Sequence, residues 1–390
     1  MTARPVPLFD LGAQHAEIKE EVAEAVARVM AEQNFVRGSE VEGFEKLIAE
    51  HTGAGYAVAC GSGTDALLLS LMAQGIGPGD RVVCPAFSFF SSASVIKRLG
   101  AEIIFADVDP QTLCIGPKQV ESALGCNDSV SALIAVHLFG ATAAPIDALV
   151  DLSRKNGLAL VEDAAQAIDA RDDSGGRAGI RGDYGCLSFY PTKNLGAYGD
   201  GGMIFTQDPD RADRLRRLRD HGEGPAGHHP LLGINSRLDG IQAAILSVKL
   251  RHLSRWTQAR RSHAALYDQC FDDLGGGVGS GSFEALDLPL RRPLSPAPPA
   301  LHVYHHYVVR VAAEHRDPLR AHLGRYQIGT GLYYPVPLHL QPSLAGRTAP
   351  PALPVSEAAA QECLALPVHP SLCSEQIHFV VDAIRRYFEG

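Results

Sequence analysis

The first half of the chain alternates short apolar runs with longer amphipathic segments. The apolar runs predict strands at Tyr56–Cys60, Arg81–Cys84, Glu102–Ala106, Ala132–Leu138 and Leu158–Glu162. The segments with apolar residues at helical spacing predict helices at Ile18–Glu32, Val41–His51, Asp65–Ala73, Ser91–Leu99 and Pro145–Asn156. This alternation predicts an α/β fold, with a mainly parallel, doubly wound sheet and helices on both faces.

The pattern changes in the last third of the chain. Gly240–Trp256 predicts one long helix, and the flexible and proline-rich runs LGGGVGSGSF and RRPLSPAPPALH follow it. A strand at His302–Val311 and helices at Asp317–Tyr326 and Glu375–Phe388 come next. We therefore expect a smaller second lobe after the main sheet.

Composition and charge exclude several classes of protein. The chain has 390 residues, of which 46% are hydrophobic and 20% charged, as is usual for a soluble globular protein. The net charge of −9 argues against nucleic acid or an anionic membrane as the main partner. No apolar stretch is long enough to span a membrane, and the start MTARPVPLFDLGAQ lacks the apolar core of a signal peptide.

Cysteine usage bears on the compartment. The eight cysteines are scattered, no two form a CxxC pair, and several lie in apolar runs as buried free thiols do. This pattern favours a reduced, cytoplasmic protein over a disulfide scaffold or a zinc site.

The stretch CLSFYPTKNLGAYGD places Lys193 just after a strand-like run, Cys186–Tyr190, and before several glycines. A single lysine after a strand is usually an exposed surface residue. Two other segments favour a reactive lysine here, because they supply what a lysine that binds pyridoxal phosphate (PLP) needs. Such a lysine loses its proton in a dry pocket and forms an imine with an aldehyde.

The first supporting segment is the turn Gly61–Thr64, which opens a helix. Its small residues allow backbone N–H groups and the positive end of the helix to face a phosphate monoester. The turn is not a P-loop, because no lysine follows at the GxxxxGK spacing, and it lacks the GxGxxG pattern of NAD-binding dehydrogenases. The alternative is a glycine turn with Thr64 as the helix N-cap.

The second segment, LALVEDAAQA, runs from an apolar strand into Glu162 and Asp163. A buried acid at a strand end needs a partner, and a protonated pyridine nitrogen is one, while a helix cap or salt bridge is the alternative. In PAFSFFSSAS, Phe87 and Phe89 share one face of an extended chain, so either could stack on a flat ring or belong to the core. Ligands of such sheets bind where the strands end, so these segments point to one crevice.

Two pairs of adjacent histidines invite a metal interpretation. His228–His229 lie in a loop without a clear carboxylate partner, and His305–His306 lie in the predicted strand, where neighbours face opposite ways. This is poor geometry for chelation, so we expect no metal.

Six motifs, in order, resemble the DegT/DnrJ/EryC1/StrS family of PLP-dependent nucleotide-sugar aminotransferases. They are GSGTDAL, PAFSFFSSAS, VEDAAQAIDA, SFYPTKNLGAYGDGG, GINSRLDGIQAAIL and YYPVPLHLQP. The resemblance covers nearly the whole chain, from PLFDLGAQ to PVHPSL. It implies fold type I, with a mainly parallel seven-stranded sheet in a large PLP-binding domain (1–255) and a smaller C-terminal α+β domain (256–390).

The resemblance also implies roles for individual residues. Lys193 would form the imine with PLP, and Asp163 would hold the pyridine nitrogen. The other cofactor contacts would be Phe89 on the ring face, Gln166 at the ring hydroxyl, and Gly63, Thr64 and Ser188 at the phosphate. Asn235 would reach the phosphate of the neighbouring subunit's cofactor, so the sites would form across a homodimer. The substrate contacts would be Arg237, near the donor carboxylate or the sugar, and Tyr333, Tyr334 and His339, for which packing between lobes is the alternative.

The activity implied is transfer of an amino group from an amino acid, with L-glutamate as the expected donor, to a nucleotide-linked keto-sugar. LGAYGDGGMIFT and YYPVPLHLQP look most like members acting on 3-keto sugars, which make amino sugars for polysaccharides or glycosylated metabolites. Three alternatives stay open: transamination at C4, sugar dehydration, and a non-catalytic regulatory role. The dehydratase branch of the family replaces the lysine with histidine, so Lys193 favours transamination.

Overall fold

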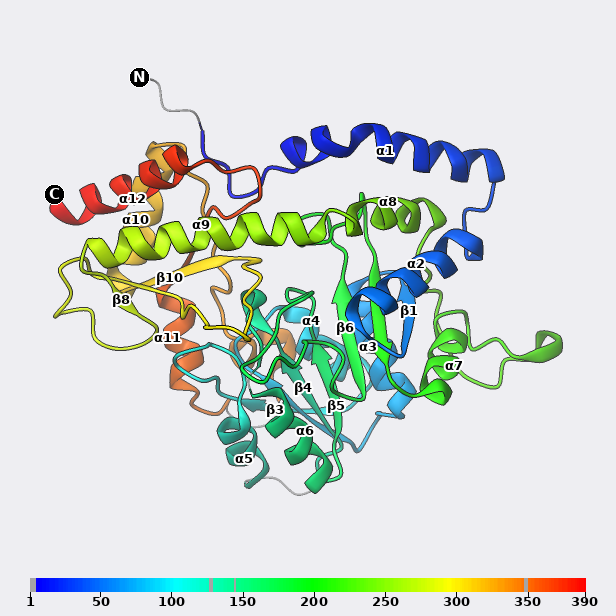
Figure 1. Cartoon of the computed structure of the whole chain (residues 1–390). Coiled ribbons are helices and arrows are strands. Elements are labelled where there is room, and N and C mark those ends of the chain that lie inside the picture. The colour runs from blue at the N-terminus through cyan, green and yellow to red at the C-terminus, as the bar shows by residue number, and fades with distance from the viewer. Residues whose placement is uncertain (1–4, 126–128, 144, 347–349) are drawn as a thin grey trace.

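The computed structural model describes residues 5–125, 129–143, 145–346 and 350–390. Its main element is a seven-stranded sheet (Figure 1). Its strand order is β1-β7-β6-β5-β4-β2-β3. The strands are β1 Tyr56–Cys60, β2 Arg81–Pro85, β3 Glu102–Ala106, β4 Ala132–Val136, β5 Ala159–Asp163, β6 Tyr184–Ser188 and β7 Gly202–Thr206. β7 is antiparallel to β1 and β6, and the other neighbours pair in parallel. The predicted mainly parallel sheet is confirmed.

Helices cover both faces of this sheet. In β1, Val58 and Cys60 pack into the core that contains α3, whereas Ala57 and Ala59 face the core that contains α2 and α8. Successive side chains of a strand point to opposite faces, so this alternation places helices on either side. The helices of this part are α1 Leu11–Glu32, α2 Gly38–Thr52, α3 Gly63–Gln74, α4 Phe90–Arg98, α5 Pro117–Gly125, α6 Ile146–Lys155, α7 Pro209–Leu218 and α8 Gly240–Leu250.

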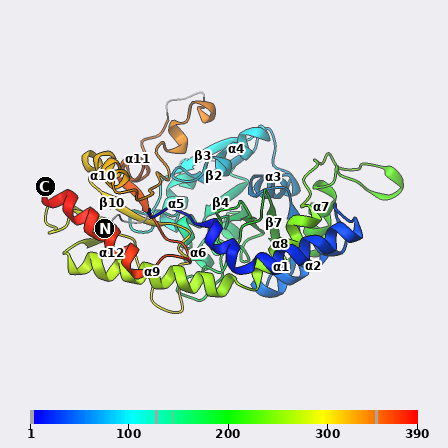
Figure 2. The same ribbon diagram turned by 90° about the horizontal axis from the view of Figure 1, so that it is seen from above.

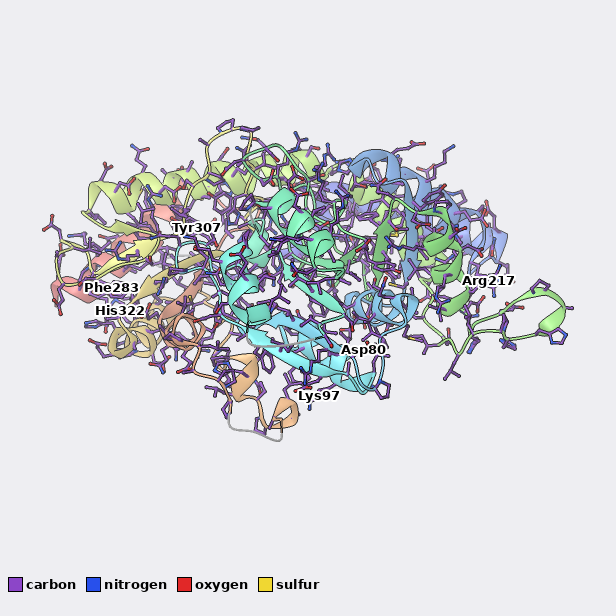
Figure 3. All side chains as sticks on the ribbon, turned by 90° about the horizontal axis from the view of Figure 1, so that it is seen from below. Asp80, Lys97, Arg217, Phe283, Tyr307 and His322 are labelled. Carbon is purple, nitrogen blue, oxygen red and sulfur yellow. The ribbon has the colours of Figure 1, made fainter. Side chains whose placement is uncertain are left out.

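A second, four-stranded sheet lies toward the C-terminal end of the chain and has a core of its own. Its order is β11-β10-β9-β8, with strands β8 Gly277–Val278, β9 Leu290–Arg292, β10 Tyr307–Val311 and β11 Cys363–Leu366. The accompanying helices are α9 Leu253–Asp273, α10 Ala313–Arg325, α11 Pro354–Glu362 and α12 Ser374–Glu389. Figure 3 shows Tyr307 and His322 at this end of the molecule and Arg217, on α7, at the opposite end.

The N-terminal segment connects the two parts. Val6 is fully buried in the second core, and its N–H donates to the carbonyl of Gln327 at 3.0 Å. The chain then turns into α1, which lies along α8 (Figure 2). The domain boundary expected at residues 255 and 256 falls inside α9, and it stays a prediction.

Three predicted elements need correction. The helix expected over Gly240–Trp256 is two helices, since α8 ends at Leu250 and α9 begins at Leu253. The strand expected over His302–Val311 begins only at Tyr307. The strand expected over Cys186–Tyr190 is shifted to Tyr184–Ser188, so the chain leaves the sheet five residues before Lys193.

Seven of the eight cysteines lie in the described residues and are free thiols, while Cys126 lies outside them. Within the described ranges, no helix is both long and apolar enough to cross a membrane. The same residues contain no cluster of three or more His, Cys, Asp or Glu side chains that could hold a metal ion, and the expectation of no metal stays a prediction.

Candidate active site

β5 ends in two neighbouring acids that have different surroundings. The carboxylate of Glu162 accepts hydrogen bonds from His137 Nε2 (2.8 Å) and from the backbone N–H groups of Gly179 (2.9 Å), Arg181 (2.7 Å) and Gly182 (2.6 Å). Burial alone would raise the pKa of Glu162, but these hydrogen bonds bring it below its ordinary value. Glu162 therefore ties together the segment that follows β5.

Asp163, on the other face of the same strand, has fewer partners. It is 5% exposed and accepts hydrogen bonds from Ser92 Oγ at 2.8 Å and from the N–H of Ala165 at 3.2 Å. Its side chain also lines a cavity at the carboxyl ends of the strands. This carboxylate is held in place and still has room for a further partner.

Lys193 lines the same cavity, in the loop after β6. Its backbone N–H donates to the carbonyl of Tyr190 at 2.8 Å, which shapes the turn that presents the side chain. Removal of the amine from bulk water lowers the pKa of Lys193 from 10.5 to about 8, although the charge of Asp163 opposes this effect. The amine thus becomes neutral far more readily than that of an exposed lysine.

The N-terminus of α3 forms a third wall of the cavity. Ser62, and not Thr64, is the N-cap, because its Oγ accepts from the N–H of Asp65 at 3.0 Å. A Cβ at Gly63 would lie 2.6 Å from the Cβ of Ser188, so only glycine allows the helix to approach the end of β6 so closely. Thr64, Gly63 and Ser188 therefore surround one spot at the positive end of a helix, where an anion is favoured.

Aromatic and amide side chains complete the cavity on the opposite side. Phe89 is 55% exposed and lines the cavity, whereas Phe87 is buried in the core, although both rings lie near that of Tyr334, with centroids 6.0 and 6.3 Å away. Gln166 accepts from the N–H of Phe139 at 2.7 Å and donates through Nε2 to the hydroxyl of Tyr334 at 2.9 Å. Tyr333 and Tyr334 both line the cavity, and their contact with a substrate stays a prediction.

The cavity has a volume of about 500 Å³, which is in the range of sites for small molecules. Of the expected site residues, it brings together Gly63, Thr64, Phe89, Asp163, Gln166, Ser188, Lys193, Tyr333 and Tyr334. Within the described ranges, Lys193 is the one Lys or Arg side chain in its lining.

Three expected site residues lie elsewhere. Asn235 is exposed in the loop before α8, and Arg237 pairs with Asp220 at 2.9 Å. His339 is buried 3.2 Å from the carboxylate of Glu357, with its ring 6.2 Å from that of Phe105. This placement does not support His339 as a sugar contact, and it fits the packing alternative instead.

The sequence did not identify several cavity residues. Ser92 lies inside the motif PAFSFFSSAS, but nothing in the motif shows that its hydroxyl bonds to Asp163. His137, His305 and His306 also line the cavity. The adjacent pair His305–His306 is the sequence signal that could have identified two of them, but such a pair first suggests a metal site.

Comparison with known proteins gives the family. The model of the DegT/DnrJ/EryC1/StrS aminotransferase family matches residues 16–385. The chain belongs to this family. Its resemblance to the DegT/DnrJ/EryC1/StrS proteins, first seen in six motifs, is confirmed over almost the full length.

Relatives within the DegT/DnrJ/EryC1/StrS family have diverse names. The chain is 42% identical to a pleiotropic regulatory protein of Geobacillus stearothermophilus, with 98% of each chain covered. It is 40% identical to a dTDP-3-amino-3,4,6-trideoxy-α-D-glucose transaminase of Streptomyces venezuelae, covering 98% of this chain and 96% of the relative. The crystal structure of S. venezuelae DesV with a ketimine intermediate matches with a TM-score of 0.90, 39% identity and full coverage of both chains. The expected fold type I is confirmed.

The family implies PLP as the cofactor, and the cavity fits this group. A phosphate suits the N–H groups at the start of α3, where Gly63, Thr64 and Ser188 line the cavity. A cationic ring nitrogen suits the carboxylate of Asp163, and an aldehyde suits an amine with a pKa of about 8. The residues that would hold PLP are thus Lys193, Asp163, Gly63, Thr64 and Ser188.

Proposed function

We propose that this chain is a PLP-dependent enzyme that transfers an amino group from an amino acid to a nucleotide-linked keto-sugar. The observation that supports this most strongly is the meeting of three features in one cavity of about 500 Å³. These are the readily neutralised amine of Lys193, the fixed carboxylate of Asp163 and the start of α3. They come from segments far apart in the sequence, and each suits a different part of PLP.

Bound PLP supplies an aldehyde that accepts the amino group and a ring that withdraws electrons from the bond being broken. The chain supplies the proton transfers and the electrostatics. The amine of Lys193 takes the proton from Cα of the donor and later returns it, which an amine with a pKa of about 8 does well near neutral pH. Asp163, oriented by Ser92 and the N–H of Ala165, keeps a proton on the ring nitrogen.

We infer that the acceptor is a 3-keto sugar, that the donor is L-glutamate, and that the product serves polysaccharide or glycoside synthesis. The position of the amino group is supported by the relative from S. venezuelae, whose name specifies a 3-amino sugar. Tyr333 and Tyr334 offer hydroxyl groups and aromatic faces in the cavity, as sugar-binding sites commonly do.

The complete site is proposed to form across a homodimer. The cavity holds a doubly charged phosphate, a donor carboxylate and a diphosphate in the proposed reaction, yet Lys193 is its one Lys or Arg side chain in the described part of the chain. Asn235 is exposed, and Arg237, which pairs with Asp220, lies in the same loop, so this loop can contact a second subunit. A partner copy would thereby supply the missing donors.

A regulatory role without catalysis is the second candidate, because the regulatory protein from G. stearothermophilus is 42% identical. An absorbance spectrum distinguishes the two functions. The proposed enzyme, purified with PLP, shows absorbance of a lysine-bound cofactor, and L-glutamate changes that absorbance. A spectrum that is unaffected by glutamate would contradict the proposed donor.

A panel of nucleotide keto-sugars tests the acceptor. Incubation with L-glutamate is expected to give a product with the mass of the corresponding amine from a 3-keto sugar. Conversion of 4-keto sugars alone would contradict transamination at C3 and indicate transamination at C4 instead. Loss of a hydroxyl group without gain of nitrogen would instead indicate a dehydratase.

A further inference from the structure

His306 has an unusual position in the active-site cavity. It immediately precedes β10, is only 4% exposed, and lines the cavity together with Lys193 and Tyr333. It also lines a second cavity of about 290 Å³. None of the roles expected for PLP binding uses it.

The ring of His306 is held firmly. It stacks on the ring of Tyr333 with centroids 4.1 Å apart and an interplanar angle of 20°. Its backbone N–H donates to the carbonyl of Phe139 at 3.2 Å, and buried Arg260 donates to the carbonyl of Tyr304, two residues earlier, at 3.2 Å. An imidazole fixed in this way loses little freedom when a ligand binds to it.

The imidazole nitrogens of His306 have no hydrogen-bond partner among the described residues, in contrast to those of its histidine neighbours. His305 Nδ1 lies 3.3 Å from Asn194 Oδ1, and His302 Nδ1 accepts from the N–H of Tyr304 at 2.9 Å. A molecule in the cavity can therefore bond to these nitrogens without displacing a partner within the protein.

The charge of His306 restricts which chemical group can bond to its imidazole. Burial, together with the positive charges of Lys193 and Arg260, lowers the pKa of His306 well below its ordinary value. The ring is therefore neutral, with one N–H donor and one acceptor nitrogen. A hydroxyl group, which both donates and accepts, matches it, whereas a carboxylate or phosphate favours a cation.

We propose that His306 binds a hydroxyl group of the acceptor sugar and thereby selects hydroxylated keto-sugars over deoxy analogues. This inference rests on the function proposed above and adds a specificity-determining contact to it. The stack on Tyr333 supports this, because it holds the imidazole beside a tyrosine that lines the same cavity.

The test compares nucleotide keto-sugars that each lack one hydroxyl group, with wild type, His306→Leu and His306→Gln. Wild type is expected to lose about tenfold or more in kcat/KM for the analogue that lacks the bound hydroxyl, the value of one hydrogen bond. In His306→Leu that ratio falls to within about twofold of one, and His306→Gln, which keeps a donor and an acceptor, restores part of it. Dissociation constants of the amino-sugar products give the same comparison without turnover.

His302→Leu is the matched control, because His302 is a buried histidine that lines only the second cavity in the described structure. It is expected to keep the wild-type ratio, and thermal unfolding with bound PLP shows whether each variant is folded. Equal discrimination in wild type, His306→Leu and His306→Gln would overturn the role of His306 alone. Absence of conversion of every nucleotide keto-sugar by wild type would overturn the proposed function, and this inference with it.

Discussion

Two lysines with similarly lowered pKa values have different surroundings and different roles. Lys193 lies in the active-site cavity, and Lys249 lies on α8, where it is 2% exposed. Burial lowers the pKa of each from 10.5 to about 8. The acidity of the amine therefore does not distinguish them.

Their partners do. Lys249 donates to the carbonyl of Gly196, and its ammonium is 5.1 Å from the ring centroid of Tyr198. The hollow beside it has no carboxylate in its described lining. Lys193 has no side-chain hydrogen bond within the described ranges and shares its cavity with Asp163. A buried lysine with satisfied contacts supports structure, whereas one that faces an acid across an open cavity is available for chemistry.

The largest expected effect is that of Lys193→Ala. Without the amine, neither covalent binding of PLP nor the proton transfer at Cα is possible, so turnover is expected to fall by about 10⁴-fold or more. Steady-state amino transfer from L-glutamate measures this, and circular dichroism checks the fold. Retention of more than a few per cent of wild-type turnover would contradict the role of Lys193.

Glu162→Ala is expected to have the next largest effect, on stability. Its carboxylate is buried against His137 and three backbone N–H groups, which would all lose their partner. The free energy of unfolding is expected to fall by about 3–5 kcal/mol, measured by urea unfolding. A loss under 1 kcal/mol would mean that this cluster does not stabilise the fold.

Asp163→Asn is the matched variant on the neighbouring residue. It removes the charge while it keeps the shape and the bond with Ser92, so stability is expected to change by under about 1 kcal/mol. Turnover is expected to fall about 100-fold or more, because the ring nitrogen loses its anionic partner. A wild-type rate in this variant would remove Asp163 from the mechanism.

Lys249→Met is expected to have a smaller effect. It removes the bond to Gly196 in the loop after Lys193, and the cost is expected to be about 1–3 kcal/mol in stability. The variant should still bind PLP covalently, because Lys193 stays in place. Loss of covalent PLP in a folded Lys249→Met protein would reverse the roles assigned to the two lysines.

The smallest effect is a shift with pH, measured in the Lys249→Met background to remove the other lysine whose pKa is about 8. Capture of an aldehyde requires the neutral amine, so the rate of PLP binding to the cofactor-free protein rises with pH as the amine loses its proton. Because the pKa of Lys193 is about 8, the rate should level off above that value. A rate that keeps rising up to about pH 10.5, the ordinary lysine pKa, would show that the amine is not desolvated.

Local pattern was enough to predict the elements whose two ends are marked by polar residues or breakers. β1 and β3 occupy the residues expected, Tyr56–Cys60 and Glu102–Ala106. The break between α8 and α9 was missed because apolar residues continue through it: Leu250 and Leu253 are both buried, and no proline or glycine marks the turn. Boundaries set by tertiary packing leave no local signal.

The same distinction applies to the site. Asp163 and Lys193 could be predicted because each has an unusual local context, an acid at the end of an apolar strand and a lysine before a glycine-rich run. His306 and Ser92 act through contacts with residues far away in the sequence, such as Asp163 for Ser92, which no periodicity encodes. Asn235 was expected to act on a second subunit, which one chain does not contain, and Arg237 lies in the same loop.

The central claim is that Lys193, rather than the equally acidic Lys249, carries the cofactor. Reduction of the PLP-loaded protein with borohydride fixes the pyridoxyl group on the lysine to which it was bound, and peptide mass spectrometry then locates it. The modification is expected on the peptide that contains Lys193, and none is expected on Lys249. Modification of Lys249 or of a surface lysine, with Lys193 unmodified, would contradict it.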